Sequence, residues 1–387
     1  MRSRKKKTIK RISRMIALML LPSAVAATAS GISRLSGGSS DKHLRTAGTS
    51  SAAVLASGEV SDKYRRLSAV DILDSSAILS EGYGIAEEKD ESAGVRLKSP
   101  LEMVSASPGD KPYPTQWTAG GSIIRNTYIP YSGTQFFDLE NGGQVNNKTS
   151  VPNDTLISES RCLPNFTISS TSEPQVLIYH THTTESFEPF VRANYDAEFN
   201  YRTTDETKNV IMVGDAIQAE LEAQGINVIH VRTIHDYPSY NGAYDRSRAS
   251  IVPILEQYPS IKVALDIHRD AISGEGVAYQ PYIEKDGREA AQIMIISGCD
   301  DGTLGMPNYM KNFHFACALQ QKLETDNPGL TRPILFDYRK YNQDLTNGSL
   351  LIEVGSHGNT LEQVQYSGQL FGRSLAGLLN SVKEDKK

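Results

Sequence analysis

From residue 174 onward, short apolar runs alternate with longer amphipathic segments, and no other feature of the chain constrains its fold as strongly. The apolar runs that suit strands are 176–180, 226–231, 262–268, 291–297 and 350–355. The amphipathic segments that suit helices are 207–224, 244–258, 308–325 and 360–382. Strands that alternate with helices indicate an α/β fold with a mainly parallel sheet flanked by helices. In such a fold, functional groups gather at the carboxyl ends of the strands.

The first 30 residues have the composition of an export or membrane-targeting segment. MRSRKKKTIKRISR carries eight Lys or Arg residues, and the uncharged run MIALMLLPSAVAATA follows it. A membrane-spanning helix needs about 20 apolar residues, so this shorter, proline-broken run favours a signal peptide, with a single-pass anchor as the alternative. Either reading places the rest of the chain outside the cytoplasm, attached to the cell membrane or secreted.

Two further parts are expected before the main domain, which we assign to 172–385. Residues 31–115 are rich in Ser, Ala and Gly, and this composition predicts a disordered linker, with a small helical domain around 60–80 as the alternative. Residues 116–171 contain β-formers and turn residues, which predict a small β-containing N-terminal extension to the domain.

Composition excludes one class of partner. The net charge is −5 and the pI is about 6.0, so the chain lacks the basic footprint of a nucleic-acid-binding protein. The cysteines are Cys162, Cys299 and Cys317, and none is spaced as in a CxxC motif. We interpret all three as buried small hydrophobic residues rather than as zinc thiolates.

Polar side chains end three separate strands of the expected sheet. His180 and His182 follow the run VLIY, His268 ends KVALDIH, and Glu353 lies near the end of LLIEVG. With the nearby Glu185, these residues supply the two histidines and one glutamate that commonly hold a catalytic zinc ion. The remaining carboxylate, Glu353, would then serve as the general base, and metal plus base together indicate hydrolysis.

Spacing does not decide between the first two histidines. His180 and His182 are two residues apart, so they would face the same side of a continuing strand, and either one could bind the metal. His357, which follows Glu353 in GSHGNT, is a further candidate for lining the site.

Four motifs, in order, resemble the stage II sporulation protein P family of endospore-forming bacteria. The motifs are YHTHTTESF, RTIHDYPSYNGAYDRSR, ALDIHRDA and YNQDLTNGSLLIEVGSHGNT. The resemblance covers about 172–382. It implies an amidase-like fold and a zinc-dependent N-acetylmuramoyl-L-alanine amidase acting on peptidoglycan, with possible endopeptidase activity on peptide cross-links. It also implies septal wall remodelling during forespore engulfment, together with a lytic transglycosylase and a membrane scaffold, and membrane attachment through the N-terminus.

The resemblance also assigns roles to single residues. It favours His182 over His180 as a zinc ligand and implies Glu185 and His268 as the other two ligands. Glu188 and Glu198 are the alternatives to Glu185. Glu353 takes the place of the catalytic glutamate.

Positions within the matched motifs add two further roles. Arg269 would hold a carboxylate or a developing oxyanion, or else pair with Asp266 or Asp270, and Asn342 would bind the substrate amide. Other functions compatible with this sequence are a zinc peptidase on secreted proteins and a non-catalytic wall-binding scaffold.

Overall fold

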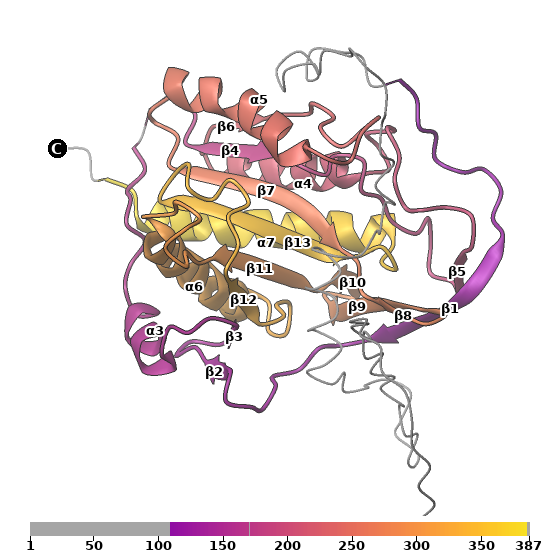
Figure 1. The fold of residues 1–387 in the computed structure, drawn as a ribbon, viewed down its shortest axis with the longest axis horizontal. Coiled ribbons are helices and arrows are strands. Elements are labelled where there is room, and N and C mark those ends of the chain that lie inside the picture. Colours follow the sequence, from indigo (N-terminus) through magenta and orange to yellow (C-terminus); the bar gives the residue numbers. More distant parts are fainter. Residues whose placement is uncertain (1–108, 170, 385–387) are drawn as a thin grey trace, which may run out of the picture. The chain divides into compact units, whose positions relative to one another are not determined.

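The computed structural model describes residues 109–169 and 171–384, all of which belong to one compact unit. Its main sheet has eight strands (Figure 1). In spatial order these are β2 (Phe136–Asp138), β3 (Gln144–Asn147), β12 (Ile334–Asp337), β11 (Ile293–Gly298), β13 (Gly348–Ser356), β7 (Val263–Asp270), β4 (Val176–Tyr179) and β6 (Val228–His230).

The main sheet is mainly parallel, as the sequence predicts. Only β2 against β3 and β11 against β13 run antiparallel. Strands β13, β7, β4 and β6 are parallel neighbours, so their carboxyl ends lie along one edge. In this part of the sheet β13 and β7 are buried along their whole length, because helices or loops cover both faces.

Within the described residues, five helices accompany the sheet. They are α3 (Asn153–Glu159), α4 (Val210–Ala223), α5 (Ala243–Gln257), α6 (Tyr309–Asp326) and α7 (Leu361–Ser381). Helices α4, α6 and α7 cover one face, where the largest apolar core lies, and α5 covers the other face over a smaller core (Figure 1). Helix α7 is capped at its N-terminus by Thr360, whose side chain forms a capping box with that of Gln363.

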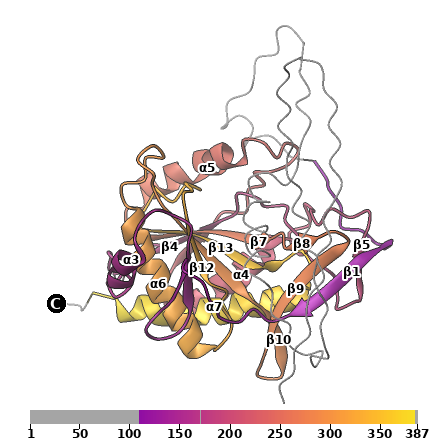
Figure 2. The same ribbon diagram turned by 60° about the horizontal axis from the view of Figure 1, so that its bottom comes forward.

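A second sheet lies beside the main one (Figure 2). Its strands are β10 (Arg288–Ala291), β9 (Val277–Lys285), β1 (Ala119–Asn126) and β5 (Asn194–Asp196), with β8 (Ser273–Gly274) paired to β9. The sequence analysis does not predict this sheet. The expected β-containing extension 116–171 is divided between the two sheets, because β1 joins the second sheet whereas β2 and β3 form an edge of the main sheet.

The predicted helices and strands of the main domain, the cysteines and the N-terminal segments can be compared with the structure one by one. All nine predicted strands and helices are present, with ends shifted by a few residues, whereas β12 was missed. Cys299 and Cys317 are buried as expected, but Cys162 is exposed and this interpretation was wrong. No helix within 109–384 is long and apolar enough to span a membrane. The predicted export segment 1–30 and almost all of the predicted linker 31–115 lie outside the described residues.

Candidate metal centre

Three of the predicted ligands lie together at the carboxyl edge of the main sheet. His182, Glu185 and His268 are buried, and each offers a ligand atom within 4.8 Å of the others. The Nδ1 atom of His182 is 3.6 Å from Glu185 Oε1, and Nδ1 of His268 is 3.4 Å from Glu185 Oε2. The carboxylate therefore lies between the two imidazoles.

The structure separates the two neighbouring histidines. Strand β4 ends at Tyr179, so the side-to-side alternation of a strand does not continue, and His180 and His182 do not share a side as the spacing suggested. His180 faces α4, where its Nδ1 lies 2.9 Å from the carbonyl of Ile267 and its Nε2 lies 2.8 Å from His230. Both ring nitrogens of His180 thus have partners other than the residues around His182.

Glycine at position 214 of α4 makes room for this pair of histidines. A Cβ atom at Gly214 would lie 2.5 Å from Nε2 of His230 and 3.0 Å from Nε2 of His180. Only a residue without a side chain lets the helix approach so closely. The close packing of α4 against His180 and His230 therefore helps to fix the start of the loop that carries His182.

Two tyrosines of the α5 region enclose His182. Its ring stacks on Tyr240 with centroids 4.6 Å apart and meets the edge of Tyr244 at 5.6 Å. Burial lowers the pKa of His182, which keeps the imidazole neutral, as a metal ligand must be. Its Nδ1 is buried without a hydrogen-bond partner.

His268 is oriented by a second carboxylate. Its Nε2 lies 2.9 Å from Asp266 Oδ1 in a buried ion pair. Asp266 in turn accepts hydrogen bonds from the backbone and hydroxyl of Thr181. Although burial lowers the pKa of His268, Asp266 and Glu185 outweigh it and raise the pKa well above its usual range. In the metal-free site, a proton on His268 balances these carboxylates.

Glu185 is held by donors as well as by the histidines. The backbone N–H of Arg269 donates to its Oε2 at 3.1 Å, and Nη2 of Arg202 lies 3.4 Å from its Oε1. Burial alone would raise the pKa of Glu185, but the contacts with His182 and His268 lower it well below its usual value. The two alternatives are placed elsewhere: Glu188 binds Tyr201 and Arg192, and Glu198 is exposed.

Glu353 lies next to the group. It pairs in register with His268 on the neighbouring strand, so the two side chains project from the same face. Both carboxyl oxygens are buried without a hydrogen-bond partner. Burial, reinforced by Asp270, raises the pKa of Glu353 to about 8, and Asp270 itself is neutralised by Arg332 at 2.7 Å.

A cavity of about 330 Å³ opens beside Glu185. Arg202, Tyr240, Arg269 and His357 line it, and residues of β8 and β9 from the second sheet form part of its wall. His357, the further candidate of the sequence analysis, is thus one of the residues that line this cavity.

The remaining two predicted residues are tied to backbone and helix groups. The Arg269 guanidinium donates to the carbonyls of Ser186, Asp270 and Tyr201. The Asn342 amide donates to Tyr244 and Ser247 of α5 rather than facing the cavity.

The donor set fits a zinc ion. Two imidazoles and one carboxylate match the usual ligands of a catalytic zinc, and the Asp266 contact matches the carboxylate that orients a ligand histidine. The orphaned Nδ1 of His182 would gain its missing partner. The sequence did not reveal Tyr240 and Arg202, nor the role of Asp266 beside His268. Asp266 lies two residues before His268 on the same strand face, so this role could have been found from that spacing.

Comparison with known proteins extends these observations. Two solved structures from the genus Clostridioides or Clostridium are similar to part of this chain. The CwlD amidase from Clostridioides difficile in complex with the GerS lipoprotein is 12% identical, with a TM-score of 0.33, over 54% of this chain and 99% of that chain. The N-acetylmuramoyl-L-alanine amidase from Clostridium difficile 630 is 17% identical, with a TM-score of 0.32, over 55% and 97%.

The sequence comparisons identify the family. A stage II sporulation protein P from Bacillus subtilis (strain 168) is 30% identical over 203 residues, which are 49% of this chain and 47% of that protein. The chain therefore spans about half the length of this relative. The family model for stage II sporulation protein P matches residues 129–376, which is more than half of the chain and includes the whole candidate metal centre. The chain belongs to the stage II sporulation protein P family.

Proposed function

We propose that this protein is a zinc-dependent peptidoglycan hydrolase that cuts the amide between the lactyl group of muramic acid and the L-alanine of the stem peptide. One observation carries the proposal: His182, Glu185 and His268 form a three-ligand set beside Glu353, a buried carboxyl group with no other partner. Membership of a sporulation family supports a cell-wall substrate.

His182, Glu185 and His268 would hold the zinc ion, with Asp266 fixing the orientation of His268. Zinc, when bound, acts as a Lewis acid on a carbonyl oxygen and makes water a stronger nucleophile. The chain's own proton carrier is Glu353. It would accept the proton of the attacking water as the new carbon–oxygen bond forms, and donate a proton to the amine nitrogen as the carbon–nitrogen bond breaks.

The environment of Glu353 suits this proton transfer. A general base works best when its pKa lies near the working pH, and burial brings the pKa of this carboxyl from its ordinary acidic value to about 8. The cavity beside Glu185 offers a place for the substrate. Tyrosine rings in its lining suit a ligand that offers sugar faces.

The setting of the reaction is part of the same proposal. We place the enzyme on the outer side of the cell membrane, attached through residues 1–30 or released if that segment is cleaved. It would act on the septal wall during engulfment, with a lytic transglycosylase and a membrane scaffold as partners.

A digestion experiment tests the function. Purified sacculi would be incubated with the zinc-loaded chain and the products identified by mass spectrometry, with bound zinc measured in parallel. We expect free stem peptides from intact glycan, and a His268→Ala variant should lose one zinc equivalent together with the activity. Cut cross-links without released stems would instead indicate an endopeptidase. Cleavage of casein with intact sacculi would indicate a zinc peptidase, and the absence of products would indicate a scaffold.

A further inference from the structure

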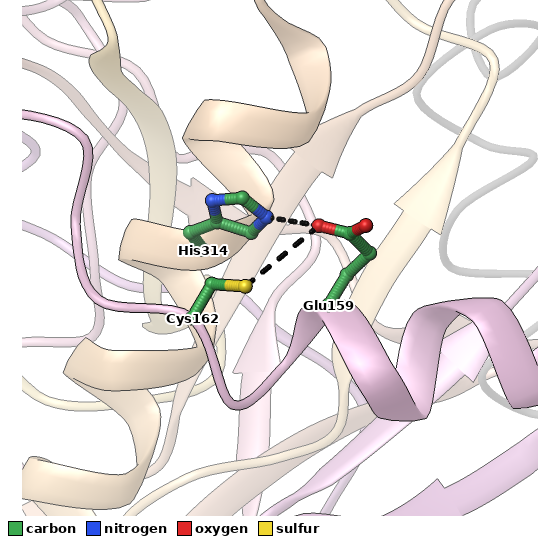
Figure 3. Close-up of side chains that lie close together, drawn as sticks. All are labelled: Glu159, Cys162 and His314. Atoms are coloured by element: carbon green, nitrogen blue, oxygen red, sulfur yellow. Dashed lines mark hydrogen bonds and ion pairs between the residues drawn. The ribbon is translucent and has the colours of Figure 1, made fainter.

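A second group of metal-binding side chains lies outside the candidate metal centre. Glu159, Cys162 and His314 each offer a ligand atom within 4.8 Å of the others. Figure 3 shows the three side chains pointing toward one another, with Glu159 at the end of α3, Cys162 in the loop after it and His314 on α6. Within the described residues, these are the only two groups of this kind.

The local fold brings these residues together without help from a metal. Helix α3 ends at Glu159, and the backbone N–H of Cys162 donates to the carbonyl of Glu159 at 3.0 Å, so the chain turns back on the helix end. Leu156 of α3 is buried in the main core, and Phe315 of α6 packs against Phe166 with ring centroids 5.2 Å apart. Apolar packing thus fixes both sides of the site.

The donor atoms of the three side chains lie close enough together to reach one ion. The Sγ atom of Cys162 is 3.9 Å from Glu159 Oε2, and Nε2 of His314 is 2.5 Å from the same oxygen. Ligand atoms on one tetrahedral zinc lie roughly 3.3–3.7 Å apart, given metal–ligand bonds of about 2.0–2.3 Å. Small side-chain rotations would give this spacing, and the ion would replace the hydrogen bond between the imidazole and the carboxylate.

The chemistry of the three donors selects a particular class of ion. A thiolate, an imidazole and a carboxylate are the three ligand types that zinc takes, and a thiolate disfavours calcium and magnesium, which prefer oxygen. The two anionic ligands would balance a divalent charge. Cys162 is exposed, and the side chains of His314 and Glu159 are 14% and 35% exposed, so water can supply a fourth ligand.

We infer that Glu159, Cys162 and His314 form a second site for a zinc-like divalent transition metal, which ties α3 and its following loop to α6. This site is separate from the hydrolytic centre, and the inference does not depend on the proposed function. Its role would be to hold the α3 segment, which adjoins the edge strands β2 and β3 in the chain, against the main domain.

Cobalt(II) distinguishes the two sites by spectroscopy. A cobalt–thiolate bond gives a charge-transfer band in the near ultraviolet, whereas the candidate catalytic site contains no cysteine. The full chain would be stripped with a chelator and titrated with cobalt(II) alone. We expect two equivalents to bind and the sulfur-to-cobalt band to appear with one of them.

Variants assign the band. Cys162→Ser should abolish it and reduce the stoichiometry to one, and His314→Gln should weaken the binding that gives the band by about 10- to 100-fold or more. Cys299→Ser is the matched control, because that cysteine is buried, and should keep the band. His268→Ala should remove the other equivalent and leave the band unchanged. No band with the unmodified chain, or a band that survives Cys162→Ser, would overturn the inference, whichever result the digestion of sacculi gives.

Discussion

Replacing Glu353 by glutamine separates the two consequences of burying this carboxyl group, one for catalysis and one for stability. Glutamine keeps the shape of the side chain but cannot carry a proton between water and a leaving group. The three ligands remain, so the variant should bind zinc as the unmodified chain does. Because a positioned general base contributes about 10²- to 10⁴-fold to a rate, release of stem peptides should fall by that factor. Retained activity would refute the role of Glu353.

The stability consequence applies to the metal-free chain. In the folded state, burial raises the pKa of Glu353 from 4.5 to about 8, whereas the unfolded chain has the ordinary value. Between these two pH values the folded chain keeps a proton that the unfolded chain releases, so stability falls as pH rises. At pH 7, which lies about 2.5 pH units above the pKa of the unfolded chain, keeping this proton costs about 3 kcal/mol of folding free energy; at pH 5 the cost is less than about 1 kcal/mol.

Urea unfolding of the chelator-treated chain at pH 5 and pH 7 measures this difference. Glu353→Gln should remove the cost, so its advantage over the unmodified chain should grow by about 2–3 kcal/mol between the two pH values. Glu256→Gln is the matched control, because Glu256 is exposed on α5, and it should follow the pH dependence of the unmodified chain. Parallel curves for Glu353→Gln and the unmodified chain would refute the assignment of a buried, unpaired carboxyl group.

Three further predictions concern the residues that support the site. Asp266→Asn should weaken zinc binding by about 10- to 100-fold, because the carboxylate that orients His268 is lost. A competition titration with a chromophoric chelator measures the affinity, and excess zinc should restore activity. Unchanged affinity would argue against that role. Gly214→Ala should lower the free energy of unfolding in urea by about 1–3 kcal/mol, because the new methyl group would collide with His230. An unchanged free energy of unfolding would show that the packing adjusts to the methyl group without loss. Arg332→Met should lower the free energy of unfolding by about 3–5 kcal/mol in the same measurement, because it removes the ion-pair partner of the buried Asp270. The loss should be much smaller when Arg332→Met is combined with Asp270→Asn.

The central part of the fold can be predicted because local pattern and tertiary structure agree there. Strand β7 is apolar up to its polar end except for Asp266, and the chemistry of His268 follows from its place at that end. The second sheet could not be predicted in this way. Its strands β8 and β10 are short, and β9 mixes charged, polar and apolar residues because much of it is only partly buried, so no period of two stands out.

The candidate site shows where sequence reasoning ends. The pair His180 and His182 could not be separated by spacing, because the answer depends on where β4 stops and on which helix packs against the following loop. Asn342 matched a motif in the sequence, yet its amide is used to bind α5, a contact between residues nearly one hundred positions apart. Such long-range partners leave no local signal.

The β3 strand also bears on how this protein can be divided for experiments. It pairs in parallel with β12, and β2 protects its other side. A fragment that begins at residue 172 would lack both strands, and the backbone N–H and C=O groups of β12 would form a new open edge. Such an edge recruits strands from other molecules. Expression of the described domain alone should therefore begin ahead of β1, and shorter fragments are expected to aggregate even though His182, Glu185 and His268 are retained.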